Sequence, residues 1–380
     1  MMKKINLLFT LLSISIFITY GMSIFGGDKL ITNPKLLKLE VNKWHKLHTV
    51  KKGDKVFFKR QEHGGSCFDS KRGLLILIGS NTHSGSRGRG KLEDSNNPRY
   101  YNPVTNLWTQ DYSGDPMSTY KVNAKHIPVA GVKGDHPWAM HTFGGVIFDS
   151  KRDEMVVASH PGHLVPNRFT NQFKELWPKI KKHPTWTYNL EKKTWISLPS
   201  NPISFFPNCM VFDSDRNMII GHNGRGIYEL SGEPRSWKII VKGGQVGWHN
   251  NGIYDNKNKV FLGFGTNKNS NDILVYDPTK KTLIKKSTPG TRPPKDQHNP
   301  MAFDSNIGKT VVLVDRDKKT TETWLYAYEK DEWQKVEAAG FPVALGMNYN
   351  MEYDTIHKVL LLVEGGIRRR PTSTWALKLK

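Results

Sequence analysis

Cysteine is nearly absent from this sequence, which contains only Cys67 and Cys209 in 380 residues. Two cysteines cannot form the disulfide framework that stabilises many small exported domains, so the fold must depend on a packed apolar core. We predict two buried free thiols at these positions, since cysteine is among the most buried residue types. A single disulfide or a shared metal ion stays open as an alternative.

Acidic residues are scarce, with 34 Asp and Glu against 56 Lys and Arg, which gives a formal charge of +22. A charge of this size attracts anionic partners over long distances. Many of the lysine pairs, such as Lys181 and Lys182, are of the kind that keeps a surface soluble.

The apolar run at the N-terminus extends from Ile5 to Tyr20, after two lysines and before the small residues Gly21 and Ser23. This pattern predicts a secretory signal peptide over residues 1–23. A membrane anchor is the alternative, because the run is close to the lower length limit for a spanning helix. We expect a secreted protein, extracellular or periplasmic, for which nucleic acid is a poor partner and an anionic glycan a better one.

A short sequence phrase recurs along the chain: small and apolar residues, an aspartate, a turn and an apolar run. Internal repeats of this kind indicate a repeat architecture. Six copies are visible: residues 64–80, 144–160, 208–223, 251–265, 300–315 and 349–364. Each copy predicts two antiparallel strands joined by a tight turn. Because aspartate at the first turn position bonds the backbone two residues on, we interpret the six turn aspartates as structural; they are Asp69, Asp149, Asp213, Asp255, Asp304 and Asp354.

A second phrase, an aromatic strand followed by a turn and in most copies a Trp-bearing strand, follows most copies of the first. Two hairpins make a four-stranded blade, so we predict an all-β, kelch-like β-propeller with six visible blades. The last copy lacks a fourth strand, and residues 43–50 supply an unpaired one that would close the ring. A seventh blade would have to lie in residues 49–62 or 112–138, which lack the turn phrase. The repeat-fixed tryptophans are then packing residues: Trp108, Trp195, Trp237 and Trp333.

The predicted domain organisation is a lead-in at residues 24–42 and a single β-propeller catalytic domain at residues 43–380. Two insertions interrupt the repeats, at residues 111–140 and 162–184, and we expect a short helix near residues 171–180. Long insertions on one rim of a propeller commonly build binding surfaces.

Alignment on the turn aspartates places polar residues of different blades at two shared positions. Six residues before each aspartate stand His63, Phe143, Pro207, His249, His298 and Asn348. After the second strand stand His83, His160, His222 and Asp315, followed by His163, Arg225 and Arg316. We expect these groups, together with His141, to surround one mouth of a central channel.

Several chemistries are poorly supported by this set. There is no G-x-S-x-G elbow for acyl transfer, and the turn aspartates leave no evident inward carboxylate pair for glycoside hydrolysis. Histidines can bind a divalent metal, but their spacings lack a strong metal motif. β-Elimination of a uronate fits better, because it needs a cation at the sugar carboxylate, a base near C5 and an acid near O4. Arginine and histidine can supply these roles without a metal.

The segments HTFGGVIFDSKRDEMVVASHPGH (residues 141–163) and GHNGRG (residues 221–226) resemble the β-propeller polysaccharide lyases that act on ulvan. The resemblance implies that His141 and His160 handle protons and that Arg225 neutralises the substrate carboxylate. The family also uses a tyrosine, for which we find no matching position, and His249 is the candidate replacement; Tyr188 and Tyr254 are interpreted as blade residues. The family is described as seven-bladed, and some members hold a structural zinc, for which no ligand set matches here.

The sequence hypothesis is therefore a monomeric lyase that cleaves an acidic, ulvan-like polysaccharide, with no cofactor required and a structural zinc left open. The catalytic candidates are His141, His160, His249 and Arg225. The substrate-binding candidates are His63, His163, His222, His298, Arg316 and Asn208. Two alternatives stay open: a non-catalytic kelch-like binder of anionic glycan, and a metal-dependent enzyme related to oligogalacturonate lyases.

Overall fold

The computed structural model describes residues 31–58, 63–79, 96–166, 171, 173–199, 203–244, 247–265, 270–316, 320–339, 345, 349–365 and 371–380. The predicted signal peptide, the first part of the lead-in and His83 lie outside the described residues. Among the residues described, no helix has the length and apolar character needed to cross a bilayer.

The described chain is all-β, and its main elements are six antiparallel four-stranded sheets. Three of them lie earlier in the chain: β2 (Gly65–Asp69), β3 (Leu74–Ile78), β4 (Arg99–Asn102) and β5 (Leu107–Gln110); β9 (Val146–Asp149), β10 (Glu154–Val157), β11 (Trp186–Asn189) and β12 (Thr194–Ser197); and β13 (Cys209–Asp213), β14 (Met218–Asn223), β15 (Gly226–Ser231) and β16 (Ser236–Lys242). Two follow: β17 (Asn251–Asp255), β18 (Val260–Phe264), β19 (Ile273–Asp277) and β20 (Thr282–Lys286); and β21 (Met301–Asp304), β22 (Lys309–Arg316), β23 (Thr320–Ala327) and β24 (Glu332–Val336).

The sixth sheet joins the two ends of the described chain. It contains β25 (Tyr349–Asp354), β26 (Val359–Glu364) and β27 (Ser373–Lys378), and its fourth strand is the N-terminal β1 (Lys43–Thr49). β1 pairs antiparallel with β27, so the prediction that an N-terminal strand completes the C-terminal sheet is confirmed. The predicted lead-in is also part of the fold, because helix α1 (Pro34–Leu37) places the buried Leu36 in an apolar cluster with residues of β3 and β26.

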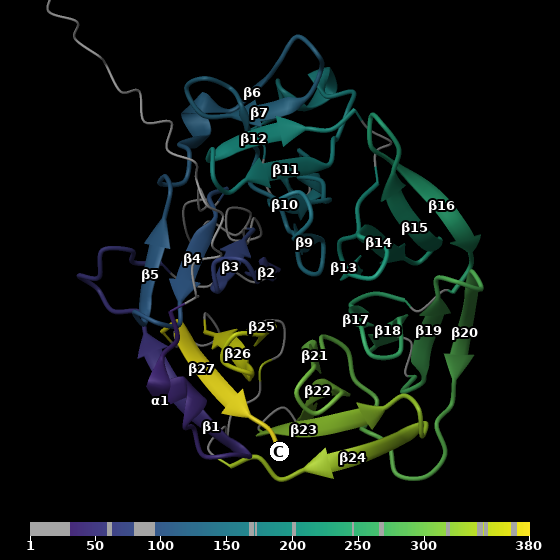
Figure 1. Cartoon of the computed structure of the whole chain (residues 1–380). Helices are drawn as coiled ribbons and strands as arrows, with labels where there is room; N and C mark the ends of the chain where they lie inside the picture. The colour runs from purple at the N-terminus through teal and green to yellow at the C-terminus, as the bar shows by residue number, and fades with distance from the viewer. Residues whose placement is uncertain are drawn as a thin grey trace, which may run out of the picture. The chain divides into compact units, whose positions relative to one another are not determined.

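Each sheet packs its faces against two neighbours. Six apolar clusters each combine buried residues from at least two different sheets. The first strands β2, β9, β13, β17, β21 and β25 contact one another and lie innermost in Figure 1, with the fourth strands outside. This arrangement is consistent with a blade-type β-propeller, and it explains why second strands are continuously apolar: both of their faces are covered.

The turn aspartates fix the first hairpin of each four-stranded sheet. In all six copies the aspartate Oδ1 accepts hydrogen bonds from the backbone N–H groups two and three residues later. The six side chains are at most 1% exposed. The fifth residue of each turn has a φ between 52° and 68°, as at Gly73 and Lys358, which the right-handed twist of a hairpin favours. The structural interpretation of these aspartates is confirmed.

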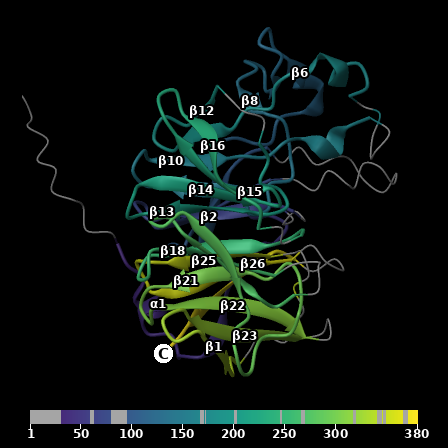
Figure 2. The same ribbon diagram turned by 90° about the vertical axis from the view of Figure 1, so that its right-hand side faces the viewer.

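The first insertion forms a seventh, three-stranded sheet, β6 (Lys121–Val122), β7 (Pro128–Ala130) and β8 (His136–Pro137), instead of another blade. Figures 1 and 2 both show it beside β12. It shares an apolar cluster with the second insertion, where Trp138 and Phe173 pack at 4.9 Å between ring centroids. Of the short helix expected near residues 171–180, the described residues show one short segment, the 3-10 helix Trp177–Lys179, whose second residue is a proline.

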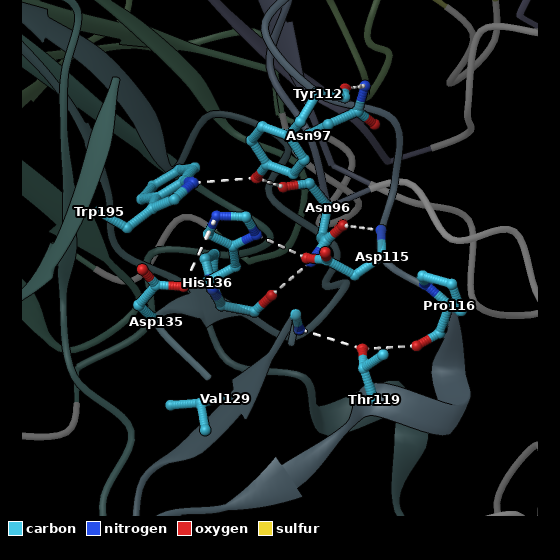
Figure 3. A network of polar contacts seen from close by, with 12 residues as sticks. Asn96, Asn97, Tyr112, Asp115, Pro116, Thr119, Val129, Asp135, His136 and Trp195 are labelled. Carbon is cyan, nitrogen blue, oxygen red and sulfur yellow. Dashed lines mark hydrogen bonds and ion pairs between the residues drawn. The ribbon is translucent and has the colours of Figure 1, made fainter. Parts of the chain in front are cut away.

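A polar network fastens the first insertion to the second sheet (Figure 3). His136 Nδ1 lies 2.8 Å from Asp115 Oδ2, which also accepts a 2.7 Å bond from Asn96 Nδ2. Tyr112 donates to Asn96 O and accepts from Trp195 Nε1 of β12. Because the buried Asn96 and Asp115 find partners in this network, the insertion is held by directed bonds as well as by its apolar cluster.

Gly221 in β14 packs closely against the ring of Phe205. A Cβ at this position would lie 2.1 Å from Phe205 Cζ, and Phe205 is fully buried. We expect Gly221→Ala to lower the free energy of unfolding by about 1–3 kcal/mol through overpacking. Gly224→Ala, in the same hairpin, meets nothing within 4 Å and is the matched control. Urea unfolding of both variants tests this, and equal destabilisation would contradict the steric explanation.

Candidate functional site

Four of the residues that stand six positions before a turn aspartate share an unusual backbone conformation. The φ angles are 61° at His63, 43° at Phe143, 62° at His249 and 62° at His298. Non-glycine residues rarely adopt positive φ, and clusters of such residues often mark functional sites. The shared conformation arises from the repeat, and it brings these side chains to one end of the first strands.

Five histidines pack together here, and we refer to them as the histidine cluster: His63, His141, His163, His249 and His298. His141 stacks between His163 at 3.5 Å and His63 at 4.5 Å, as measured between ring centroids. His249 lies 3.9 Å from His298 and 6.2 Å from His63. The structure thus brings together five of the residues that the sequence placed at one channel mouth.

Two phenylalanines hold the cluster. Phe206 meets His63, His141 and His163 edge-on at 5.7, 5.2 and 5.3 Å between centroids. Phe143 meets His249 edge-on at 5.4 Å and also lines a central cavity of about 310 Å³. All six first strands contribute residues to that cavity, so the cluster borders its end.

His249 and His298 are the two partly exposed histidines of the cluster, and their partial burial makes both weakly basic. Desolvation lowers the pKa of His249 to about 4, and desolvation together with the nearby His249 lowers that of His298 to about 3. Both rings are therefore neutral at neutral pH. His249 Nδ1 and His298 Nε2 are themselves buried and form no hydrogen bond with the described residues, so both nitrogens are left unsatisfied.

His141 is fully buried, whereas His249 and His298 are partly exposed. A side chain with no exposed surface cannot touch a polymer without rearrangement, so His141 is better suited to positioning its neighbours than to meeting substrate. The same argument applies to His63 and His163, which are 4% and 9% exposed.

His160, which the resemblance implied as the partner of His141 in proton handling, makes its ring contact outside the histidine cluster. The His160 ring stacks instead on His183 of the second insertion, at 4.7 Å between centroids. Burial, with the positive field of His183 as the second cause, lowers the pKa of His160 to about 4. The repeat alignment could not include His183, because this residue belongs to an insertion.

His222 also lies apart from the ring contacts of the cluster. It is fully buried in β14, its Nε2 is 3.4 Å from Gly244 O, and burial lowers its pKa to about 4. It therefore contacts the loop before β17 through Gly244.

Arg225 lies in the β14–β15 turn, is exposed, and forms no ion pair with any described residue. Its carbonyl oxygen accepts a 2.9 Å bond from Gly243 N, which ties the turn to the loop that ends at His249. Arg225 thus presents an exposed guanidinium in a turn that is bonded to the loop before His249.

Asn208, predicted to bind substrate, is 3% exposed and joins two loops. With its amide oriented to satisfy both ends, the nitrogen donates to Gly247 O at 3.2 Å and the oxygen accepts from Gly224 N at 3.3 Å. The side chain of Arg316, at the end of β22, lies outside the described residues.

Sequence reasoning missed two polar groups in the central cavity. Tyr349 Oη accepts a 2.7 Å bond from Asn251 Nδ2, and Phe143 lies 6.3 Å away between ring centroids. Glu352 accepts a 2.6 Å bond from Ser66 Oγ, and burial raises its pKa to about 7. A signal for Glu352 was present, because it is the only charged residue besides the turn aspartates in the six first strands.

Both free cysteines are buried, as predicted. Tyr188 and Tyr254 are blade residues, in β11 and β17, and donate to Asp111 and Asp215. Within the described parts of the chain, no three His, Cys, Asp or Glu side chains form a group that could hold a metal ion.

No family model matches this chain, and no curated protein matches it. Among solved structures, a novel fungal alcohol oxidase with catalytic diversity among the AA5 family, in complex with copper, is similar with a TM-score of 0.48 and 9% identity. The match covers 83% of this chain and 62% of the oxidase, so the chain spans less than two thirds of that protein.

Proposed function

We propose that the protein is an exported polysaccharide lyase, built on a closed six-bladed, kelch-like β-propeller, that cleaves a uronate-containing polymer by β-elimination. The observation that carries the proposal is the pair of neutral, partly exposed imidazoles of His249 and His298, one loop away from the exposed Arg225. The formal charge of +22 favours an acidic polymer, and the resemblance to lyases acting on ulvan favours a sulfated one.

Arg225 provides the cation that the reaction needs. Its forked guanidinium pairs with the uronate carboxylate and withdraws charge from it, which makes the proton on C5 more acidic. An arginine that is already paired would have to break that pair first, and Arg225 has no ion-pair partner among the described residues.

His249 provides the base. The imidazole of His249 takes the C5 proton, the C5–H electrons form the C4–C5 double bond, and the C4–O4 bond breaks. The imidazolium that forms is more acidic than a free imidazolium, because its pKa is about 4, and it returns the proton to O4. The reaction therefore consumes no proton, and His298 and the stacked His63, His141 and His163 hold the base in place.

The decisive experiment incubates the purified protein with ulvan, polygalacturonate and a glycosaminoglycan and follows the absorbance of unsaturated uronate. We expect absorbance to rise on at least one polymer and expect chelator to leave the rate unchanged. Salt-sensitive binding with no product on any polymer would favour the non-catalytic glycan binder. Loss of turnover in chelator would favour the metal-dependent alternative.

The pH profile tests the assignment of the base. Because burial lowers the pKa of His249 to about 4, kcat/KM should stay level as the pH falls from neutrality and should decline only near that value. A free histidine would give a decline near pH ~6.5. The folded state must be checked by circular dichroism at each pH. The unfolded chain binds more protons than the buried histidines between those two values, so stability falls as the pH falls through that window. An acid limb near 6.5 in protein that is still folded would rule out His249.

A further inference from the structure

Trp248 differs from every other tryptophan of the chain. All 11 tryptophans lie within the described residues, and ten are buried or partly buried in the sheets and insertions. Trp248 is 63% exposed and stands immediately before His249. It belongs to neither repeat phrase, so the packing argument that explains Trp108 or Trp333 does not apply to it.

Hydrogen bonds hold the described residues of the loop that carries Trp248 at more than one point. Gly243 N donates to Arg225 O at 2.9 Å, and Gly244 O faces His222 Nε2 at 3.4 Å. The side chain of Asn208 bonds both Gly247 O and Gly224 N. Gly247 directly precedes Trp248, and Gly224 directly precedes Arg225. A buried asparagine that bonds both loops holds the exposed tryptophan and the exposed arginine in one local structure.

The surroundings of this loop are cationic. Arg225 and Lys242 are exposed at the ends of the β15–β16 pair, where Gly226 pairs with Lys242. Lys285 of β20 is close enough for its charge to contribute to the lowered pKa of His222. An exposed indole among cations is suited to a ligand that has both an apolar face and a negative charge.

A uronate pyranose is such a ligand. One face of the ring presents C–H groups to an aromatic surface, whose face carries partial negative charge, while the carboxylate lies at the ring edge and pairs with a guanidinium.

We infer that Trp248 is a stacking platform for a sugar ring of the acidic polymer, in a subsite next to the one where Arg225 holds a carboxylate. This inference rests on the proposed function for the identity of the polymer. The subsite would fix the position of the chain relative to His249, so its loss should raise KM and leave kcat little changed.

Affinity electrophoresis in gels containing ulvan tests the inference, with dextran gels as the neutral control. The His249→Asn background keeps the polymer intact. We expect Trp248→Ala in that background to weaken binding by about 10- to 100-fold, and Trp248→Phe to restore part of it. Ile284→Ala is the matched control, because Ile284 is 52% exposed on the outermost strand β20. Circular dichroism confirms that each variant is folded.

The outcomes separate this inference from the lyase proposal. If wild type yields no unsaturated product but Trp248→Ala weakens binding, the stacking subsite stands and the lyase proposal falls. If wild type cleaves ulvan and Trp248→Ala binds and cleaves it equally well, the subsite is overturned and the lyase proposal stands. Self-association of wild type in the ultracentrifuge that is lost in Trp248→Ala would assign the residue to a protein interface and also overturn the inference.

Discussion

His249→Asn is expected to lower kcat on a cleavable polyuronate by a factor of about 10²–10⁴, the usual contribution of a positioned general base. Asparagine tolerates the left-handed backbone that His249 adopts, with a φ of 62°, so the substitution removes the imidazole without forcing the loop to rearrange. The expected change is in kcat and not in KM, because Trp248 and Arg225 still bind the chain. Initial rates of unsaturated product formation over a range of polymer concentrations measure both.

The matched control for this substitution is His126→Asn. His126 has nearly the same backbone conformation, with a φ of 61°, but it is exposed in the first insertion and outside the histidine cluster. We expect it to cleave at the wild-type rate. If both variants retain full activity, His249 is not the base, whereas equal losses in the two would show that asparagine at positive φ disturbs the fold and not the chemistry.

Asp213→Ala is expected to have the largest effect on stability, about 3–5 kcal/mol, as for a broken buried ion pair. The carboxylate is fully buried, accepts two backbone N–H bonds at 3.0 Å and pairs with Arg216 Nε at 2.6 Å. Arg216 also reaches Glu229 on β15 at 2.7 Å, so the aspartate links the first hairpin of the sheet to its third strand. Urea unfolding, followed by tryptophan fluorescence, measures the loss.

Asp277→Ala is the control, because Asp277 forms the same turn in the second hairpin of the next sheet. Its carboxylate accepts bonds from Thr279 N and Lys280 N, but it is 21% exposed and its cation is a solvated lysine. A loss of only about 0.5–1 kcal/mol is expected there. Equal losses at the two positions would show that the turn bonds alone, and not burial of the ion pair, stabilise these hairpins.

The histidines show which contacts the sequence predicts and which it does not. Register relative to the turn aspartate predicts that His63, His249 and His298 share one end of the first strands, because the position follows from counting residues along a strand. It does not predict which rings touch. His160 occupies an equivalent register but stacks on His183, which comes from an insertion that no repeat alignment can place.

The same limit applies to charge and accessibility. The sequence names His141 and His249 as equal candidates, yet the stacking of His163 and His63 buries the first completely and leaves the second partly exposed. The lowered pKa of His249 and the raised pKa of Glu352 are both due to burial, which depends on neighbours distant in the chain.

Local sequence patterns are enough to predict the sheets, because turn chemistry and hydrophobic alternation are local and recur in six copies. They also predict that the N-terminal strand pairs with the last one, because only one strand was missing and only one was unpaired. Three features became visible only in the folded chain: which histidines meet, that the insertion forms a small sheet, and that Trp248 is exposed beside His249. These features depend on contacts between segments that carry no repeat, so no local pattern encodes them.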